Sequence, residues 1–239
     1  MNIEGFKRVI AIPDVHGCYS ILRKLVEQGI QFNPNEDLLI FLGDYIDFRD
    51  VTKVVNRAGV NSAKVVQYVS ALKRAYPNSV VLLKGNHEVM AEKALRGNSP
   101  DDTYLWEING GVETKKSYKT LEQARVILLP FIDNLQPSFE IPQAIFVHGN
   151  IPVGQSLKTA TEDELLWDRG RYFGRKTLIV GHTVQNEIRH VGNKICLDLG
   201  CFMSGRLVGY DVLSGDVYGV SEDAYPEYQL SFPLEDRRN

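Results

Sequence analysis

The sequence predicts one α/β domain in which a largely parallel β-sheet is covered by helices. Short apolar runs alternate with amphipathic segments through the first half of the chain, and strand-like segments dominate the second half. The chain has 239 residues, of which 44% are hydrophobic and 24% charged. This composition is ordinary for a globular protein, and the length allows a sizeable core.

The first half follows a strand–helix–strand–helix–strand order. Strands are expected where four or more apolar residues run together, and helices where apolar residues recur at helical spacing. Asn61 or Ser62 is the expected cap of the second helix, and Gly29 and Gly97 are expected stops. The expected strands are 8–12, 37–42 and 79–84, and the expected helices are 19–29, 61–76 and 87–97.

The second half is expected to begin with a polar, largely helical region over 98–143, in which Asn109–Gly111 forms a turn. Strands are then expected at 144–148, 177–182 and 194–200, followed by a hairpin within 205–220 that turns at 214–216. There is no internal repeat and no clear linker. We therefore expect a single domain over residues 1–220 and an irregular C-terminal tail over 221–239.

Composition argues against several classes of protein. The apolar run near the N-terminus stops at Pro13, which is too early for a signal peptide, and no segment has the roughly 18 apolar residues of a membrane span. The three cysteines form no CxxC pair, which fits a reducing cytoplasm. A net charge of −3 gives no general attraction to nucleic acid or to an anionic membrane.

Polar residues follow the apolar runs at the points where the expected strands end. In open α/β sheets, ligands bind in the crevice beyond the carboxyl ends of parallel strands. All five histidines except His190 lie at such positions. One strand-end histidine usually has only a structural role, but the repetition at several strands indicates a functional site. The strand-end residues are Asp14 and His16, Asp44 and Asp47, Asn86 and His87, His148, and His182.

These side chains are hard or borderline ligands, suited to divalent ions such as Mn²⁺, Fe²⁺ or Zn²⁺. The set is too large for one tetrahedral zinc ion and suits two metals about 3.5–4 Å apart that share a carboxylate. Glycines beside the ligands would let the backbone pass close to the metals. These glycines are Gly17, Gly43, Gly85, Gly149 and Gly181.

The motifs that contain these residues resemble the metallophosphoesterases of the phosphoprotein phosphatase type, whose signatures are GDxHG, GDxxDRG and GNHE. Here the segments read PDVHG at 13–17, GDYIDFR at 43–49 and GNHE at 85–88, followed by VHGN and GHT. A lone GNHE is weak evidence, but five motifs in order over roughly 9–218 are specific. The first motif departs from the family pattern, because Pro13 replaces its first glycine.

Two further segments are similar to the bacterial and phage branch of the family, which includes lambda-type protein phosphatases and symmetrical diadenosine tetraphosphatases. They are WEINGGVETKKSY at 106–118 and LLWDRG at 165–170. The resemblance implies a sandwich of two central mixed β-sheets flanked by helices. We interpret Trp106 and Trp167 as packing residues.

The resemblance also implies a dinuclear metal centre. Asp14 and His16 would hold the first metal, Asp44 would bridge both, and the remaining ligands would complete the second site. We expect Mn²⁺, with Fe, Zn, Ni or Mg as alternatives. The implied ligands are Asp14, His16, Asp44, Asn86, His148 and His182.

By the same resemblance, His87 is the general acid that protonates the departing alkoxide, and Asp47 orients it. The implied nucleophile is a hydroxide that bridges the metals and attacks in line. The family's phosphate-binding arginine follows the second aspartate directly, but Phe48 stands at that position and Arg49 comes one residue later. The phosphate ligands are therefore expected to be Arg169, Asn86 and Arg49. Arg169 acting alone, or a surface role for Arg49, remain alternatives.

The leading functional hypothesis is a metal-dependent phosphatase that acts on phosphoserine or phosphothreonine in proteins, and on phosphotyrosine as a further possibility. A second hypothesis keeps the chemistry but assigns diadenosine tetraphosphate as the substrate. A third, from another class, is an inactive phosphate-binding module. The expected partners are a phosphorylated protein or a nucleotide, without nucleic acid or membrane.

Overall fold

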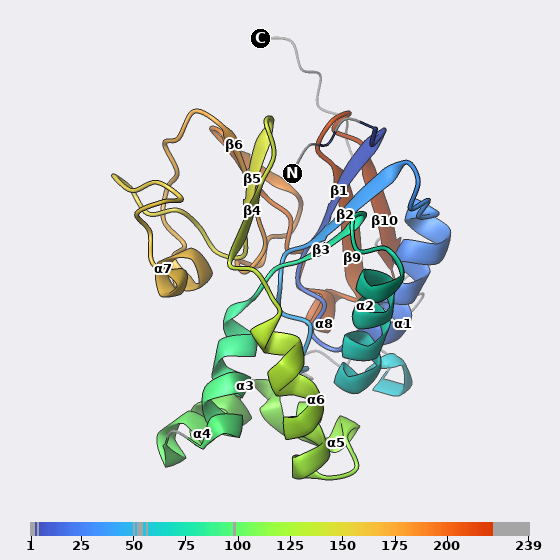
Figure 1. Ribbon diagram of the computed structural model, residues 1–239, viewed down its shortest axis with the longest axis vertical. Helices are drawn as coiled ribbons and strands as arrows, with labels where there is room; N and C mark the ends of the chain where they lie inside the picture. The colour runs from blue at the N-terminus through green and yellow to red at the C-terminus, as the bar shows by residue number, and fades with distance from the viewer. Residues whose placement is uncertain are drawn as a thin grey trace.

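The computed structural model describes residues 3, 5–49, 51, 55, 57–97 and 99–221. Within these residues, two five-stranded sheets pack against each other and share a core, with helices on their outer sides (Figure 1). The expected tail over 221–239 lies outside the described residues, except for Ser221, which ends the last strand. No described helix is long and apolar enough to cross a membrane.

The first sheet contains the three strands that were expected in the first half of the chain, together with the expected C-terminal hairpin. Its order is β10-β9-β1-β2-β3. β1, β2 and β3 are parallel to one another, and β9 pairs antiparallel with both β1 and β10. The five strands are β1 (Arg8–Ile12), β2 (Asp37–Phe41), β3 (Val80–Leu82), β9 (Arg206–Asp211) and β10 (Val217–Ser221).

The second sheet has the order β4-β5-β6-β8-β7, with β5, β6 and β8 parallel and the two edge strands antiparallel to them. The parallel arrangement expected from the order of the first half holds for β1, β2 and β3, and the two mixed sheets implied by the family resemblance are confirmed. The strands are β4 (Ser138–Glu140), β5 (Ala144–Val147), β6 (Thr177–Val180), β7 (Arg189–Val191) and β8 (Lys194–Cys196).

The parallel strands of the first sheet are buried on both faces, which explains why a second sheet is needed. Ile10 and Ile12 of β1 pack into the core beneath the helices, and Val9 and Ala11 pack into the core between the sheets. Phe146 of β5 belongs to this second core. A strand made only of apolar residues indicates that both of its faces are covered, but it does not indicate whether a helix or a sheet covers them.

The helices lie in three groups (Figure 1). α1 (Tyr19–Lys24), its π-helical continuation η1 (Leu25–Ile30) and α2 (Ser62–Ala75) lie against the first sheet, and α7 (Glu162–Trp167) lies beside the second. Asn61 caps α2 by accepting the N–H of Lys64. The first helical segment runs through Gly29 and ends at Ile30. Its C-cap is Gln31, with a φ of 53°, so the expected stop at Gly29 lies two residues before the cap.

The third group contains α3 (Asn86–Arg96) and the helical region that was expected after it. That region comprises α4 (Pro100–Trp106), η3 (Glu107–Gly111), α5 (Val112–Ser117) and α6 (Leu121–Asp133). The expected turn at Asn109–Gly111 is a break inside this region, where Gly110 has a φ of 107°. Two short elements, η2 (Arg57–Gly59) and α8 (Cys201–Ser204), complete the described fold.

The loops that follow β2 and β3 touch where both carry a glycine. A Cβ atom on Gly43 would lie 2.5 Å from the backbone nitrogen of Gly85, and Gly43 itself has a φ of 107°. Both the contact and the backbone angle exclude a larger residue.

We expect Gly43→Ala to destabilise the protein by about 2–5 kcal/mol. A left-handed backbone angle costs an alanine about 1–2 kcal/mol, and the clash adds about 1–3 kcal/mol. Urea unfolding measures the loss. The matched control is Gly97→Ala, because Gly97 has a φ of 73° but no atom within 4 Å of its Cβ position. An equal loss in both variants would show that the contact is unimportant.

Candidate active site and metal centre

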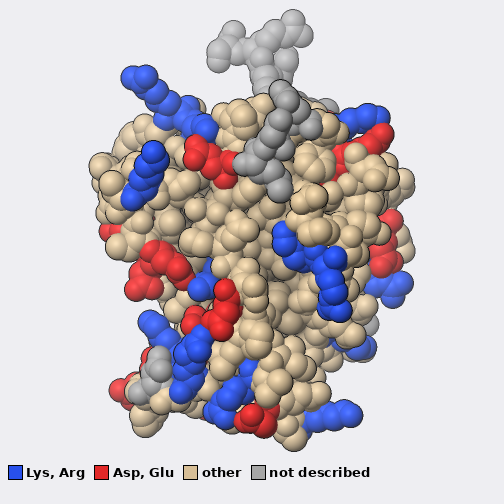
Figure 2. Space-filling view, viewed as in Figure 1, with Lys and Arg blue, Asp and Glu red and all other residues tan. Residues whose placement is uncertain are grey.

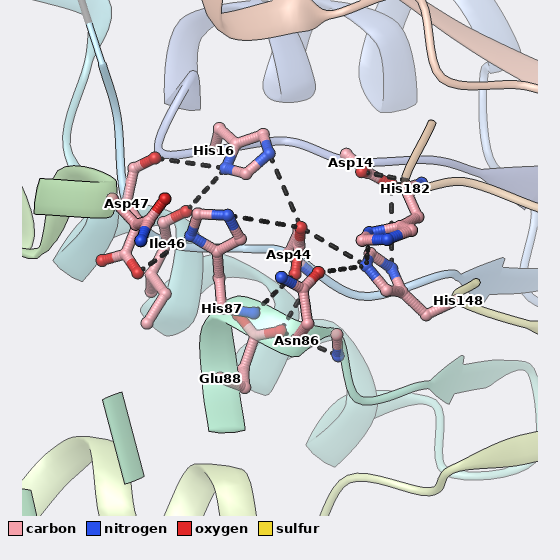
Figure 3. A network of polar contacts seen from close by, with 12 residues as sticks. Asp14, His16, Asp44, Ile46, Asp47, Asn86, His87, Glu88, His148 and His182 are labelled. Atoms are coloured by element: carbon pink, nitrogen blue, oxygen red, sulfur yellow. Dashed lines mark hydrogen bonds and ion pairs between the residues drawn. The ribbon is translucent and has the colours of Figure 1, made fainter. Parts of the chain in front are cut away.

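The carboxyl ends of the parallel strands converge and bring the strand-end residues together (Figure 3). Asp14 and His16 follow β1, and Asp44 and Asp47 follow β2. Asn86 and His87 are the first two residues of α3, directly after the β3 loop. His148 and His182 follow β5 and β6 of the second sheet. The site therefore lies where the carboxyl ends of the parallel strands of both sheets meet.

The backbone is strained where these side chains are presented. Among the described residues, five that are not glycine have a positive φ, and all except Gln31 belong to this site. A left-handed angle costs a non-glycine residue about 1–2 kcal/mol, and such strain persists only where surrounding contacts hold it. The four site residues are His16 at 47°, Asp44 at 50°, Asp47 at 70° and His182 at 62°.

Asp44 lies at the centre of the site. Its Oδ2 atom is 3.6 Å from Nε2 of His16, 3.4 Å from Nε2 of His148 and 3.9 Å from Nε2 of His87. Burial by itself raises the pKa of Asp44, but positive charge on His148 and His87 outweighs it and holds this pKa well below its usual value. Asp44 is therefore an ionised carboxylate shared by several imidazoles.

Asp44 belongs to two groups of side chains whose ligand atoms lie within 4.8 Å of one another. The first contains His16 and His87, and the second contains His148 and His182. In the second, Nε2 of His148 is 2.8 Å from Oδ1 of Asn86 and 3.1 Å from Nδ1 of His182. Two groups of candidate ligands that share one carboxylate fit a dinuclear arrangement, although the first contains His87 where Asp14 was expected.

The chemistry of the donor atoms fits cations at these positions. Nδ1 of His16 lies 3.0 Å from the carbonyl oxygen of Ile46, and Nδ1 of His148 lies 3.0 Å from that of Leu42. With a proton on each Nδ1, the Nε2 atoms of both rings face Asp44, and each can give a lone pair to a cation when it carries no proton. Nε2 of His182 is also buried and has no hydrogen-bond partner among the described residues. Acceptors that face one another in this way are stabilised by a shared cation.

Electrostatics lead to the same conclusion. Burial lowers the pKa of His148, but Asp44 and Asp14 outweigh that effect and raise the pKa to about 10. In the metal-free site a proton therefore compensates the buried carboxylates, and a cation would replace it. His16 and His182 behave differently: burial, with His87 and His148 respectively, lowers the pKa of His16 to about 4 and that of His182 to about 3. Both imidazoles are neutral, as ligands must be.

Asp14 is less centrally placed than the sequence suggests. Both of its oxygens accept the backbone N–H of His182, at 3.1 and 2.9 Å, and Oδ1 is 3.9 Å from Nδ1 of His148. It belongs to neither three-residue group. Burial, reinforced by the charge of Asp198, raises the pKa of Asp14 well above its usual value. Its role as a ligand of the first metal stays a prediction.

Asp198 is a buried site residue that the sequence analysis missed. It lines the same pocket as the metal-ligand candidates, and burial raises the pKa of its carboxyl to about 6. The signal was available, because Asp198 follows the apolar residues of β8 in the same way that Asp14 follows β1. Its carboxylate accepts the N–H of Gly200.

Glu88 holds the loops in place. Its carboxylate accepts the backbone N–H groups of Asp44, Tyr45 and Gly85, each at 2.9 Å. Its side chain is fully buried, and burial followed by the nearby charge of Asp44 raises its pKa to about 7. One carboxylate thus joins the β2 loop to the β3 loop.

His87 and Asp47 form a pair at the edge of the metal-ligand cluster. Nδ1 of His87 lies 3.1 Å from Oδ2 of Asp47, which leaves Nε2 as the atom on the side of Asp44. Burial lowers the pKa of His87, but Asp44 and Asp47 outweigh it and raise this pKa. Burial raises the pKa of Asp47, and hydrogen bonds from His87 and Thr114 oppose that shift. The pair is arranged to hold a proton on Nε2.

Both candidate phosphate-binding arginines line the same pocket as the metal-ligand cluster. Arg49 reaches it although it comes one residue later than in the family pattern, because Phe48 turns into the core and is only 1% exposed. The alternative in which Arg49 pairs with Asp50 falls partly outside the described residues. The pocket is lined by His16, Asp44, Asp47, Arg49, Asn86, His87, Asn109, Arg169, His182, Val184, Asp198 and Phe202.

We expect added Mn²⁺ to raise the melting temperature of the metal-stripped protein. An ion that binds only the folded state stabilises it by about 2.7 kcal/mol at one hundred times its Kd. Differential scanning calorimetry measures the shift. His182→Ala should strongly reduce the shift in melting temperature. The control His190→Ala, which replaces an exposed histidine of β7, should keep the shift. A shift that survives in His182→Ala would place the bound ion elsewhere.

Comparisons with known proteins agree with this geometry. Residues 7–216 match the calcineurin-like phosphoesterase family. The chain is 27% identical to serine/threonine-protein phosphatase 2 of Salmonella typhimurium, over 87% of this chain and 94% of that protein. It is 28% identical to serine/threonine-protein phosphatase 2 of Escherichia coli, over 89% and 96% of the two chains.

Among solved structures, a protein proposed to be a diadenosine tetraphosphatase aligns with a TM-score of 0.67. The alignment covers 92% of this chain and 95% of that one at 20% identity, which supports the fold alone. The family match covers nearly all of the described chain and includes every strand-end residue of the site. The chain belongs to the calcineurin-like phosphoesterase family of metal-dependent phosphoric ester hydrolases.

Proposed function

We propose that this phosphoesterase is a protein phosphatase that hydrolyses phosphoserine and phosphothreonine, and phosphotyrosine as a further substrate. The observation that carries the proposal is the position of the His87–Asp47 pair. It lines one pocket together with the metal-ligand cluster and with Arg49 and Arg169. An acid, a cluster of candidate metal ligands and two guanidinium groups around one pocket suit a dianionic phosphate monoester.

The chain's own residues account for binding and for proton transfer. Arg169 and Arg49 would donate hydrogen bonds to phosphate oxygens, with the Asn86 amide beside them. At the start of α3 the backbone N–H of His87 donates to Oδ1 of Asp44 at 3.0 Å, which holds the shared carboxylate against this helix. His87 would then give its Nε2 proton to the departing serine or threonine oxygen, and Asp47 would stabilise the imidazolium before that transfer.

Metal ions would be held by His16, His148 and His182 around the shared Asp44. Asp14 and Asn86 are the remaining predicted ligands, and His87 stays free to act as the acid. When bound, they supply Lewis-acid activation of water and positive charge beside the phosphate. We propose Mn²⁺ as the ion, because a mixture of carboxylate, amide and imidazole ligands suits it. Buried Asp44, shared by both groups, would keep the two ions together.

Two observations support a protein substrate over a dinucleotide. The relatives aligned over nearly their whole length are named serine/threonine-protein phosphatases. Phe48, which takes the place of the family arginine, is buried and so cannot stack on a nucleobase.

Nucleic acid is a poor fit as a partner. On the face shown in Figure 2, acidic and basic side chains are interspersed, without the continuous basic surface that nucleic acid requires.

Hydrolysis of diadenosine tetraphosphate is the second candidate. Trp167 favours the dinucleotide as substrate, because the residue is 38% exposed and its ring centroid lies 6.2 Å from that of His182. An exposed indole beside a phosphate site can stack on a base. The fold of the proposed diadenosine tetraphosphatase is also similar. Trp167→Ala would lower turnover of the dinucleotide but not of a phosphopeptide if this candidate were correct.

We expect the Mn²⁺-loaded protein to release phosphate from a phosphoserine or phosphothreonine peptide faster than it cleaves diadenosine tetraphosphate. The two rates are measured side by side. His87→Asn should lower kcat by about 10²–10⁴-fold, since a positioned acid contributes that much. Faster dinucleotide turnover would move the assignment to the second candidate. No turnover of either substrate would leave a phosphate-binding module.

We expect Arg169→Ala and Arg49→Ala each to lower kcat/KM for the peptide by at least about tenfold. A hydrogen bond to a charged group contributes about 1.5–3 kcal/mol. Lysine at either position should restore little, because it lacks the planar fork. Arg74→Ala, on the outer helix α2, is the control. Unchanged kinetics in Arg49→Ala would leave Arg169 as the single clamp.

A further inference from the structure

Two side chains from the helical region after α3 contact Asp47 in the active site, and neither has been given a role in the reaction. Trp106 is the last residue of α4, and its Nε1–H donates to both carboxylate oxygens of Asp47, at 2.9 Å to each. Thr114, in α5, donates its hydroxyl proton to Oδ1 of Asp47 at 2.6 Å. Trp106 is 1% exposed and Thr114 is fully buried.

These contacts leave Asp47 little freedom. Oδ1 accepts from both Thr114 and Trp106, and Oδ2 accepts from Trp106 and faces Nδ1 of His87. The Thr114 hydroxyl also accepts the backbone N–H of Asp47 at 2.9 Å. One hydroxyl therefore fixes both the backbone and the carboxylate of a residue whose φ is 70°. The remaining direction of the carboxylate is toward His87.

The segment that carries these two donors is itself fixed against the site. A Cβ atom on Gly110 would lie 2.8 Å from the carbonyl carbon of Asp47, so the backbones touch at that point. Ser62, the first residue of α2, lies 3.2 Å from the hydroxyl of Thr114. The Ser117 hydroxyl accepts the N–H of Ala63 at 3.1 Å. The segment is thus attached both to the Asp47 turn and to α2.

Simple packing does not account for this arrangement. A buried indole N–H requires one acceptor, and a buried threonine hydroxyl can be satisfied by a carbonyl of its own helix. Here both donors, 59 and 67 residues away in sequence, converge on one carboxylate that faces one histidine. Two donors on a single anion fix its orientation as well as its charge.

We propose that Trp106 and Thr114 are positioning residues that hold the Asp47 carboxylate so that His87 presents its Nε2 proton to the leaving group. The proposal rests on the proposed function, because it concerns the acid of that reaction. In the step concerned, a hydroxide derived from water uses one electron pair to form a new bond to phosphorus. The phosphorus–oxygen bond to the leaving group breaks, and its electron pair goes to the leaving oxygen. The N–H bond of His87 breaks, its electron pair stays on the imidazole, and the proton forms the new O–H bond.

A series of leaving groups tests this role. Acid help matters for phenyl phosphate, whose leaving oxygen is strongly basic, and little for 4-nitrophenyl phosphate, whose leaving oxygen is weakly basic. We expect Trp106→Phe and Thr114→Val to lower kcat for phenyl phosphate by about tenfold or more, since small displacements of reacting groups are costly. We expect a much smaller loss for 4-nitrophenyl phosphate. Thr114→Ser, which keeps the hydroxyl, should restore activity.

Two controls separate positioning from general damage. Tyr118→Phe removes a buried hydroxyl from the same segment, but this hydroxyl has no hydrogen-bond partner among the described residues, so both substrates should be unaffected. In a His87→Asn background, Trp106→Phe should cause no further loss, because residues that act through one another are not additive. Mn²⁺ affinity, measured by calorimetry, should be unchanged in both positioning variants.

A spectroscopic readout on the metal-free protein does not depend on turnover. The chain has two tryptophans, so its ¹H–¹⁵N spectrum contains two indole N–H resonances. We expect Asp47→Asn to shift the resonance of Trp106 strongly and that of Trp167 hardly at all. An unshifted Trp106 resonance would show that the indole is not bound to this carboxylate and would overturn the proposal.

The kinetic outcomes distinguish this inference from the proposed function. If the wild type hydrolyses both aryl phosphates and the two positioning variants lose equal factors on each, the inference is wrong and the proposed function stands. Further loss in the His87→Asn background would also overturn it. If the wild type hydrolyses neither aryl phosphate nor a phosphopeptide, the proposed function fails and the inference fails with it, whatever the indole resonances show.

Discussion

The buried carboxylate of Glu88 is the constraint on which the site depends. By accepting the N–H groups of Asp44, Tyr45 and Gly85, it joins the loops that leave two neighbouring parallel strands. These hydrogen bonds hold Asp44 in a left-handed conformation, in which its carboxylate lies near three histidines. Because Glu88 lies in the first turn of α3, the same contact fixes the helix that begins with Asn86 and His87.

The turn after Asp44 explains why the family arginine can be displaced. In an extended segment, a shift of one residue reverses the direction of a side chain. Asp47 instead has a φ of 70°, so the alternation of a strand does not apply. Phe48 enters the core beneath the helices, and Arg49 is left to line the pocket.

The residues that converge on the site could be predicted from sequence because each follows its own strand, and parallel strands end at a common edge. His148 and His182 were found in this way, although the sheet that carries them was not distinguished from the first. Strand partners are chosen by contacts far apart in the chain, which a local pattern does not record. The contacts of Trp106 and Thr114 with Asp47 were missed for the same reason, because no nearby residue marks them. Trp106 was correctly expected to pack, but its N–H was not considered.

The supports of His87 and the candidate metal ligands come from different parts of the architecture. Except for Asn86 at the start of α3, the candidate ligands follow strands of the sandwich, whereas Trp106 and Thr114 belong to short helices beside it (Figure 1). Peripheral segments with short helices generally open at lower free energy than central strands. A partial opening of 100–118 would release Asp47 while the strands stay paired. Such an enzyme would lose turnover on warming before it lost its metals, and would recover both activity and amide protection when this segment closed again.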